Sequence, residues 1–108
     1  MNSAEMLARY EDMLRLSQQM LACARQNEWD RLVALEQART TISGDLAKSA
    51  NKNLPKQINP VKLRKLILDI LDTDKEIKVL IESWREQLQK ILGSLGNEKK
   101  LLNFYDIT

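Results

Sequence analysis

The chain has 108 residues, of which 44% are hydrophobic and 30% charged, and its formal net charge is +2 at pH 7. Only three glycines and two prolines occur, a composition that favours helices over a sheet in one small domain. Without histidine and with a single cysteine, the chain has no intrachain disulfide and no His/Cys zinc site. The small net charge gives no support for nucleic-acid binding.

Several function classes lack the residues that they need. Histidine, the usual general base, is absent, and so are the glycine-rich phosphate-binding motifs and an EF-hand loop. We therefore expect no enzymatic activity, no metal and no cofactor. No run of about 18 apolar residues occurs, and the N-terminus does not resemble a secretory signal. We expect a cytoplasmic protein that does not insert into a membrane.

A first helix is predicted over about residues 3–26. Asn2 followed by Glu5 fits a capping box at its start. Cys23, near its end, is interpreted as a small buried hydrophobe. The apolar residues recur every seven positions in two neighbouring stripes, which is a helical period: Met6, Met13, Met20 and Leu7, Leu14, Leu21. The methionine stripe is either core filling or an adaptable partner surface.

A second helix is predicted over about residues 28–48. Asn27 is interpreted as the break and the N-cap of this helix. The short turn allows only an antiparallel hairpin with the first helix. Trp29 then lies at the closed end of that hairpin, where it either packs on the first helix or contacts a partner directly. One apolar stripe follows, formed by Leu32, Leu35, Ile42 and Leu46.

A polar linker is predicted over about residues 49–59. Residues 47–65 hold six basic groups and no acidic one. A solvated linker explains this charge, and a docking patch for an acidic partner is the alternative. Because no aromatic side chains alternate with these lysines, the segment gives no support for stacking on nucleic-acid bases.

The third helix, over about residues 60–93, has the clearest pattern. Asn59 caps it and Pro60 takes the first helical position. Asp74 alone interrupts its apolar seam, either because it is solvated there or because it fixes the register. At 1.5 Å per residue the helix is roughly 50 Å long. The seam alternates steps of four and three residues through Leu63, Ile67, Ile70, Ile77, Ile81, Trp84, Leu88, Ile91 and Leu95.

This seam is longer than the hairpin that can cover it. Long amphipathic helices with an uncovered stripe bind other helices, either a second copy of the chain or a segment of another protein. We therefore count five residues along one part of the seam as candidate partner-binding residues: Ile77, Ile81, Trp84, Leu88 and Ile91. A homodimer through the same surface is left open.

A short fourth helix is predicted over about residues 97–106, with its own cap at Asn97. Leu102, Phe104 and Tyr105 give this segment more apolar bulk than a solvated tail needs, and we count them as candidate partner-binding residues. The predicted fold is thus all-α. It is a single domain over residues 1–108, a small antiparallel bundle of three long helices with a short fourth one.

Three stretches of the chain carry a further pattern. The first is LSQQMLACARQNEWDRLVALEQAR, with Leu16, Ser17, Gln18, Leu21, Ala24, Glu28, Trp29, Asp30 and Leu32. The second lies within residues 71–93, with Leu71, Asp72, Lys78, Leu80, Leu88 and Gly93. The third is the tail KKLLNFY, with Lys100, Leu102, Asn103 and Tyr105. In their order and spacing, which cover nearly the whole chain outside the linker, these stretches resemble the FliT family of flagellar type III export chaperones.

The resemblance implies a function and a set of partners. It implies a chaperone that holds the C-terminal segment of the filament cap protein FliD. It implies docking at the export ATPase FliI with FliJ and at the export gate FlhA. The family's tail tyrosine is associated with docking at FlhA, and Tyr105 matches it. In enteric members it also implies binding of the master regulator FlhDC. The family's last helix can cover these surfaces, and this chain stops at Thr108, so autoinhibition is left open.

Two alternatives share the predicted fold. One is a helical anti-activator whose main partner is FlhDC. The other is a structural coiled-coil component, which would self-associate through the seam without a client.

Overall fold

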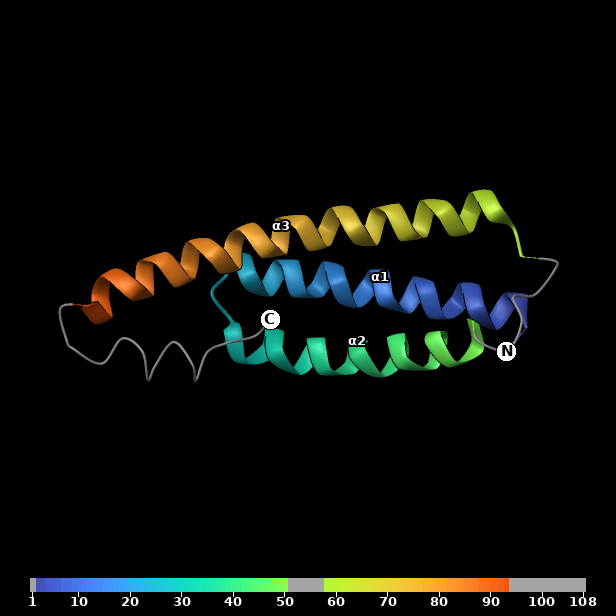
Figure 1. Ribbon diagram of the computed structural model, residues 1–108, viewed down its shortest axis with the longest axis horizontal. Coiled ribbons are helices and arrows are strands. Elements are labelled where there is room, and N and C mark those ends of the chain that lie inside the picture. Colours follow the sequence, from blue (N-terminus) through green and yellow to red (C-terminus); the bar gives the residue numbers. More distant parts are fainter. Residues whose placement is uncertain (1, 51–57, 94–108) are drawn as a thin grey trace.

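The computed structural model describes residues 2–50 and 58–93. This part of the chain forms three helices and no strand: α1 (Ser3–Arg25), α2 (Trp29–Ala50) and α3 (Pro60–Gly93). The expected all-helical fold is confirmed. α1 and α2 form an antiparallel hairpin, and α3 runs alongside α1 in the same direction (Figure 1). The predicted fourth helix and most of the linker lie outside the described residues.

The start of α1 carries a variant of the predicted capping box. The backbone N–H of Glu5 donates to Asn2 Oδ1 at 2.8 Å. Asn2 Nδ2 donates in return to Glu5 Oε1 at 2.9 Å. The return bond uses the side-chain amide instead of the backbone N–H of a standard box, and the first turn is closed all the same.

The turn between α1 and α2 corrects the prediction for Asn27. This residue has φ 61°, and it ends α1 instead of capping α2. The N–H of Asn27 donates to the carbonyl of Ala24, and the N–H of Glu28 donates to the carbonyl of Cys23 at 2.9 Å. These two bonds form a Schellman motif, whose left-handed position asparagine tolerates well. α2 therefore begins at Trp29, and Glu28 precedes it.

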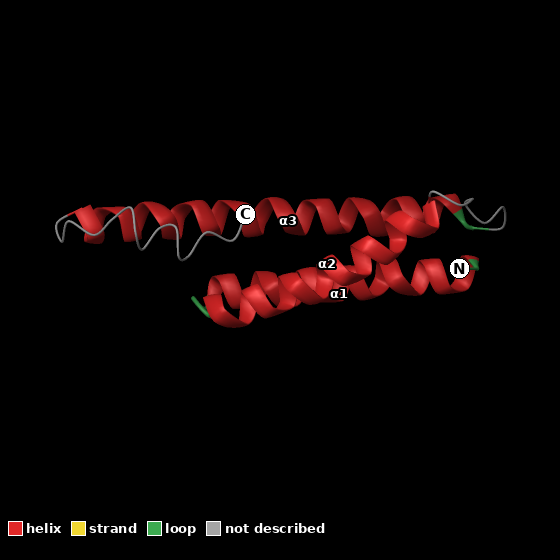
Figure 2. Cartoon of the chain, turned by 60° about the horizontal axis from the view of Figure 1, so that its bottom comes forward, coloured by secondary structure: helices red, strands yellow, loops and turns green. Residues whose placement is uncertain are grey.

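α3 begins as its sequence predicts and is much the longest helix. Asn59 Oδ1 accepts hydrogen bonds from the backbone N–H groups of Val61 and Lys62 at 3.0 and 3.2 Å. α3 has 34 residues, against 23 in α1 and 22 in α2. At 1.5 Å per residue the excess is about 17 Å. The C-terminal part of α3 accordingly extends beyond the closed end of the hairpin (Figures 1 and 2).

The central helix of the bundle is α1. It packs against both α2 and α3, whereas no Cα atoms of α2 and α3 approach within 8 Å in the described helices. The main core cluster lies near the hairpin turn, and Trp29 belongs to it, so the prediction that this residue closes the hairpin is confirmed. The cluster consists of Met20, Cys23, Ala24, Trp29, Leu32 and Ile77.

The outer face of α3 is turned away from this core. Val61 and Val79 are exposed there, together with Leu68 and Leu71. Within residues 2–50 and 58–93, no helix combines the length and the apolar character that crossing a membrane requires.

Candidate partner-binding groove

A groove lies between α2 and α3, with α1 at its base. It holds a cavity of about 230 Å³ whose apolar lining comes from all three helices: Met20 from α1, Leu32 from α2, and Ile77 and Ile81 from α3. Leu32 and Ile77 are buried. The floor of the groove is therefore continuous with the core, and an apolar side chain placed there would be removed from water on several sides.

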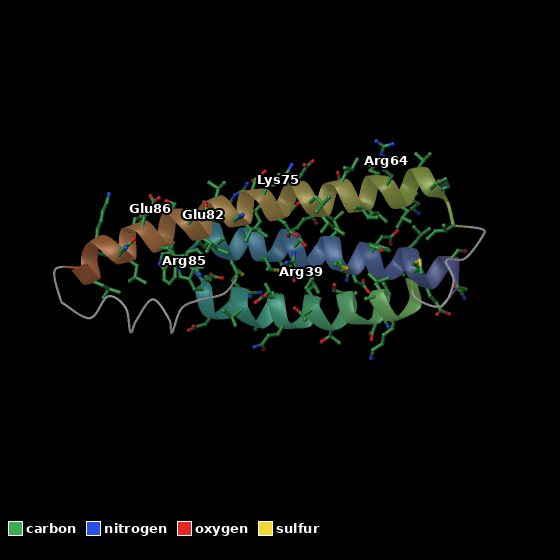
Figure 3. The ribbon with its side chains drawn as sticks, in the orientation of Figure 1. Arg39, Arg64, Lys75, Glu82, Arg85 and Glu86 are labelled. Atoms are coloured by element: carbon green, nitrogen blue, oxygen red, sulfur yellow. The ribbon has the colours of Figure 1, made fainter. Side chains whose placement is uncertain are left out.

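Charged side chains of both signs surround this apolar floor. Three acids and three bases line the cavity: Glu36, Arg39, Asp74, Lys78, Glu82 and Arg85. In Figure 3 the side chains of Arg39 and Arg85 lie between the ribbons of α2 and α3. Those of Arg64 and Lys75 lie on the side of α3 that faces away from the other two helices. An apolar floor with a charged rim is the arrangement expected for binding an amphipathic helix.

One polar bridge connects the two walls of the groove. Arg39 Nη1, from α2, donates to Ser17 Oγ of α1 at 2.9 Å and to Asp74 Oδ1 of α3. Ser17 is fully buried, so its hydroxyl depends on this bond. Of the two readings of Asp74, the structure favours the one in which this residue fixes the register of the helices.

A second contact between α2 and α3 closes the groove toward the hairpin turn. The rings of Trp29 and Trp84 lie with their centroids 4.6 Å apart and tilted by 33°. The indole Nε1 of Trp29 is buried and has no acceptor among the described residues. The tryptophan contact and the Arg39–Asp74 bridge are ten residues apart on each helix, about 15 Å.

The predicted partner-binding residues divide into three groups. Ile77 and Ile81 line the cavity, and Trp84 closes its end. Leu88 is half-buried and Ile91 is exposed, and both lie farther along α3. The tail candidates Leu102, Phe104 and Tyr105 fall outside the described residues.

The sequence did not identify the α2 wall of the groove, nor the charged rim apart from Asp74. Arg39 and Glu36 gave no signal because isolated charges on a helix are usually solvated. The one available signal was Asp74, whose position within an apolar seam calls for a cation on a facing helix. The structure shows that this cation is Arg39.

Two other features of the described residues lack the properties of a site. A depression of about 340 Å³ at Val79 and Leu80 is flanked by the Arg25–Glu76 ion pair. It is an open surface feature, since Val79 is 64% exposed. The described residues contain no group of three or more side chains that could hold a metal ion. Cys23 is buried, as predicted, and burial raises the pKa of its thiol, which lowers its reactivity.

Comparison with known proteins gives one consistent family. The model of the family described as "Flagellar protein FliT" matches residues 7–106. The flagellar protein FliT of Escherichia coli O6:K15:H31 is 27% identical over 104 residues, which are 96% of this chain and 86% of that protein. The FliT protein of Shigella flexneri is 26% identical over the same shares. No solved structure matches.

Proposed function

This chain belongs to the FliT family of flagellar proteins, and from this premise we propose that it is a cytoplasmic export chaperone. Its client is the filament cap protein FliD, whose C-terminal segment it holds and escorts to the export apparatus. It acts by binding and not by catalysis. The observation that carries the proposal is the groove between α2 and α3, with its apolar floor and charged rim.

The groove suits a helical client segment for a physical reason. α2 and α3 both pack on α1 but not closely on each other. An amphipathic helix laid between them would bury its apolar face against Leu32, Ile77 and Ile81. The rim would keep the charged side chains of the segment in contact with water and with opposite charges.

The first test is calorimetric titration of the chain with the C-terminal segment of FliD from the same genome. We expect saturable binding near one to one with a negative change in heat capacity, the sign of apolar burial. Ile81→Asp places a charge in the groove, and we expect it to weaken binding by a factor of about 100 or more.

Val79→Asp is the matched control, since it makes the same change two residues away on the exposed face of α3. We expect it to bind as the unmodified chain does. Circular dichroism shows whether both variants keep their helices. Equal binding by the two variants, or none by the unmodified chain at tens of micromolar, contradicts the proposal.

We further propose that the export partners are the ATPase FliI, FliJ and the gate FlhA, with Tyr105 in the FlhA contact. The resemblance of the tail KKLLNFY supports this assignment. Tyr105→Ala should weaken capture of FlhA while leaving the FliD titration unchanged. Loss of both interactions would contradict separate roles for the tail and the groove.

The regulator FlhDC remains the alternative partner. Binding of FlhDC by a chain that does not bind the FliD segment would favour an anti-activator. A concentration-dependent homodimer that ignores both proteins would favour a structural coiled-coil component.

A further inference from the structure

The walls of the groove are held in one register. Trp29 lies opposite Trp84, and Arg39 lies opposite Asp74. Because the two contacts are ten residues apart on both helices, the facing positions of antiparallel α2 and α3 stay aligned between them. One turn from the bridge toward the tryptophans, this alignment places Glu36 of α2 at the level of Lys78 of α3, and both line the cavity.

The charges on the two walls therefore alternate in two directions. At the level of the bridge, α2 carries a positive charge and α3 a negative one. At the next level, Glu36 makes α2 negative and Lys78 makes α3 positive. Over these two levels the sign changes by one helical turn along each wall and is opposite across the groove. On α3 the alternation continues with Glu82 and Arg85, which also line the cavity.

We propose that this fourfold charge pattern is the specificity element of the groove and selects a helical segment with the complementary pattern. On the flank that faces α2, the bound segment carries an acid beside Arg39 and a base beside Glu36. On the flank that faces α3, it carries a base beside Asp74 and an acid beside Lys78. The inference deepens the proposed function, since it describes the same groove.

The bridge can exchange partners because it is only partly buried. Arg39 is 21% exposed and Asp74 36%. The hydrogen bonds of Arg39 to Ser17 and Asp74 both use Nη1, and a guanidinium has further donors on its other nitrogens. A carboxylate of the bound segment is thus accepted without removing the bond to Ser17. At such partly solvated sites, complementary charges contribute more to specificity than to affinity.

Two synthetic amphipathic peptides of identical composition and apolar stripe test this pattern. The first carries acid then base on one flank and base then acid on the other, one turn apart, and the second has every Glu and Lys exchanged. Reversing a peptide exchanges its flanks and its order together, so the pattern does not depend on binding direction. In a calorimetric titration we expect the first peptide to bind about tenfold more tightly than the second. This difference in affinity should become smaller at high salt.

A double exchange at the bridge should abolish this preference, because Glu36 and Lys78 still favour the first peptide while the exchanged pair favours the second. Arg39→Asp with Asp74→Arg reverses the charges at the bridge, and the hydroxyl of Ser17 can donate to the new carboxylate. The matched control is Arg25→Glu with Glu76→Arg, which exchanges another interhelical ion pair outside the groove. We expect the control to prefer the first peptide as the unmodified chain does.

A second exchange covers the case in which the first variant does not fold. Glu36→Lys with Lys78→Glu changes two side chains that line the groove and leaves the hydrogen bond of Arg39 to buried Ser17 in place. This exchange should also abolish the preference. Equal affinity of the unmodified chain for both peptides overturns the inference, and so does an unchanged preference in both exchanged variants. Sedimentation of the chain alone tests whether a second copy occupies the groove. Self-association that prevents both peptides from binding also overturns the inference.

The two proposals fail separately. A chain that binds the FliD segment but ignores the peptide pattern retains its proposed function and loses the charge-based selection. A chain that discriminates between the peptides but does not bind the FliD segment retains the selection for another partner.

Discussion

The two sides of α1 and the space between α2 and α3 are built on different principles. α1 packs closely against α2 and α3. Apolar side chains from all three helices form these contacts, among them Met20 of α1, Leu32 of α2 and Ile77 of α3. Between α2 and α3 the backbones stay apart, and long side chains meet across the space in the Trp29–Trp84 ring contact and the Arg39–Asp74 bridge.

This difference shows how a small bundle can be stable and still leave room for the proposed helical client. Close apolar packing supplies most of the folding free energy and tolerates little change. Long side chains that span a wider gap contribute less, and they can move or exchange partners without unfolding the chain. The interface with α1 is thus the scaffold, and the gap is the surface available for binding.

The strongest test of the comparison is Trp29→Ala, because this side chain belongs to both regions. Trp29 is part of the main core cluster as well as the contact with Trp84. We expect a loss of about 3 kcal/mol or more in the free energy of unfolding, as for other buried aromatic side chains. Urea denaturation measures it. Loss of client binding without a change in stability would assign Trp29 to the groove alone.

Arg39→Ala tests the bridge and should have a smaller effect. The variant leaves the buried hydroxyl of Ser17 without its arginine donor and Asp74 without its cation. We expect a loss of about 1–3 kcal/mol in thermal or urea unfolding. The control is Arg25→Ala, which removes an exposed ion pair with Glu76 and should cost about 0.5 kcal/mol or less. Equal losses in the two variants would remove the distinction between the bridge and a surface pair.

Asn27→Val tests the closely packed side at the turn that connects α1 to α2. A β-branched residue is strained at φ 61°, and we expect a loss of about 1–2 kcal/mol. Asn27→Gly should be close to neutral, because glycine adopts this conformation readily. Chemical denaturation of the two variants side by side checks the order, and a valine variant as stable as the glycine variant would contradict the observed turn.

The smallest effect concerns pH and Cys23 in the same closely packed region. Desolvation by burial raises the pKa of this thiol in the folded state, against an opposing effect of Arg31. The contribution to stability is therefore complete below the unfolded pKa of about 8.5 and is lost as pH rises through the folded value. Stability measured from pH 7 to 10 should fall more steeply for the unmodified chain than for Cys23→Ala. Parallel curves would contradict the shift.

The scaffold could be predicted from the sequence because local rules determine it. The seven-residue spacing of Met6, Met13 and Met20 and the cap at Asn59 are local signals, and the structure follows them. Asn27 was misjudged because asparagine suits both an N-cap and a left-handed helix end. Only the hydrogen bonds of the turn distinguish the two.

The groove was harder to predict because it depends on which faces of distant helices meet. The seam of α3 identified Ile77, Ile81 and Trp84 but not the α2 residues that face them. The partner of Asp74 lies 35 residues away in the chain, at Arg39. No local pattern encodes that pairing, since it follows from the register in which α2 and α3 pack on α1.

The tryptophan pair has a consequence for optical measurements. The chain contains two tryptophans in all, and they are in contact at the closed end of the groove. Light absorbed by either indole therefore excites one place in the molecule, where α2 and α3 meet. Emission and near-ultraviolet circular dichroism of the unlabelled chain thus report the separation of these two helices directly.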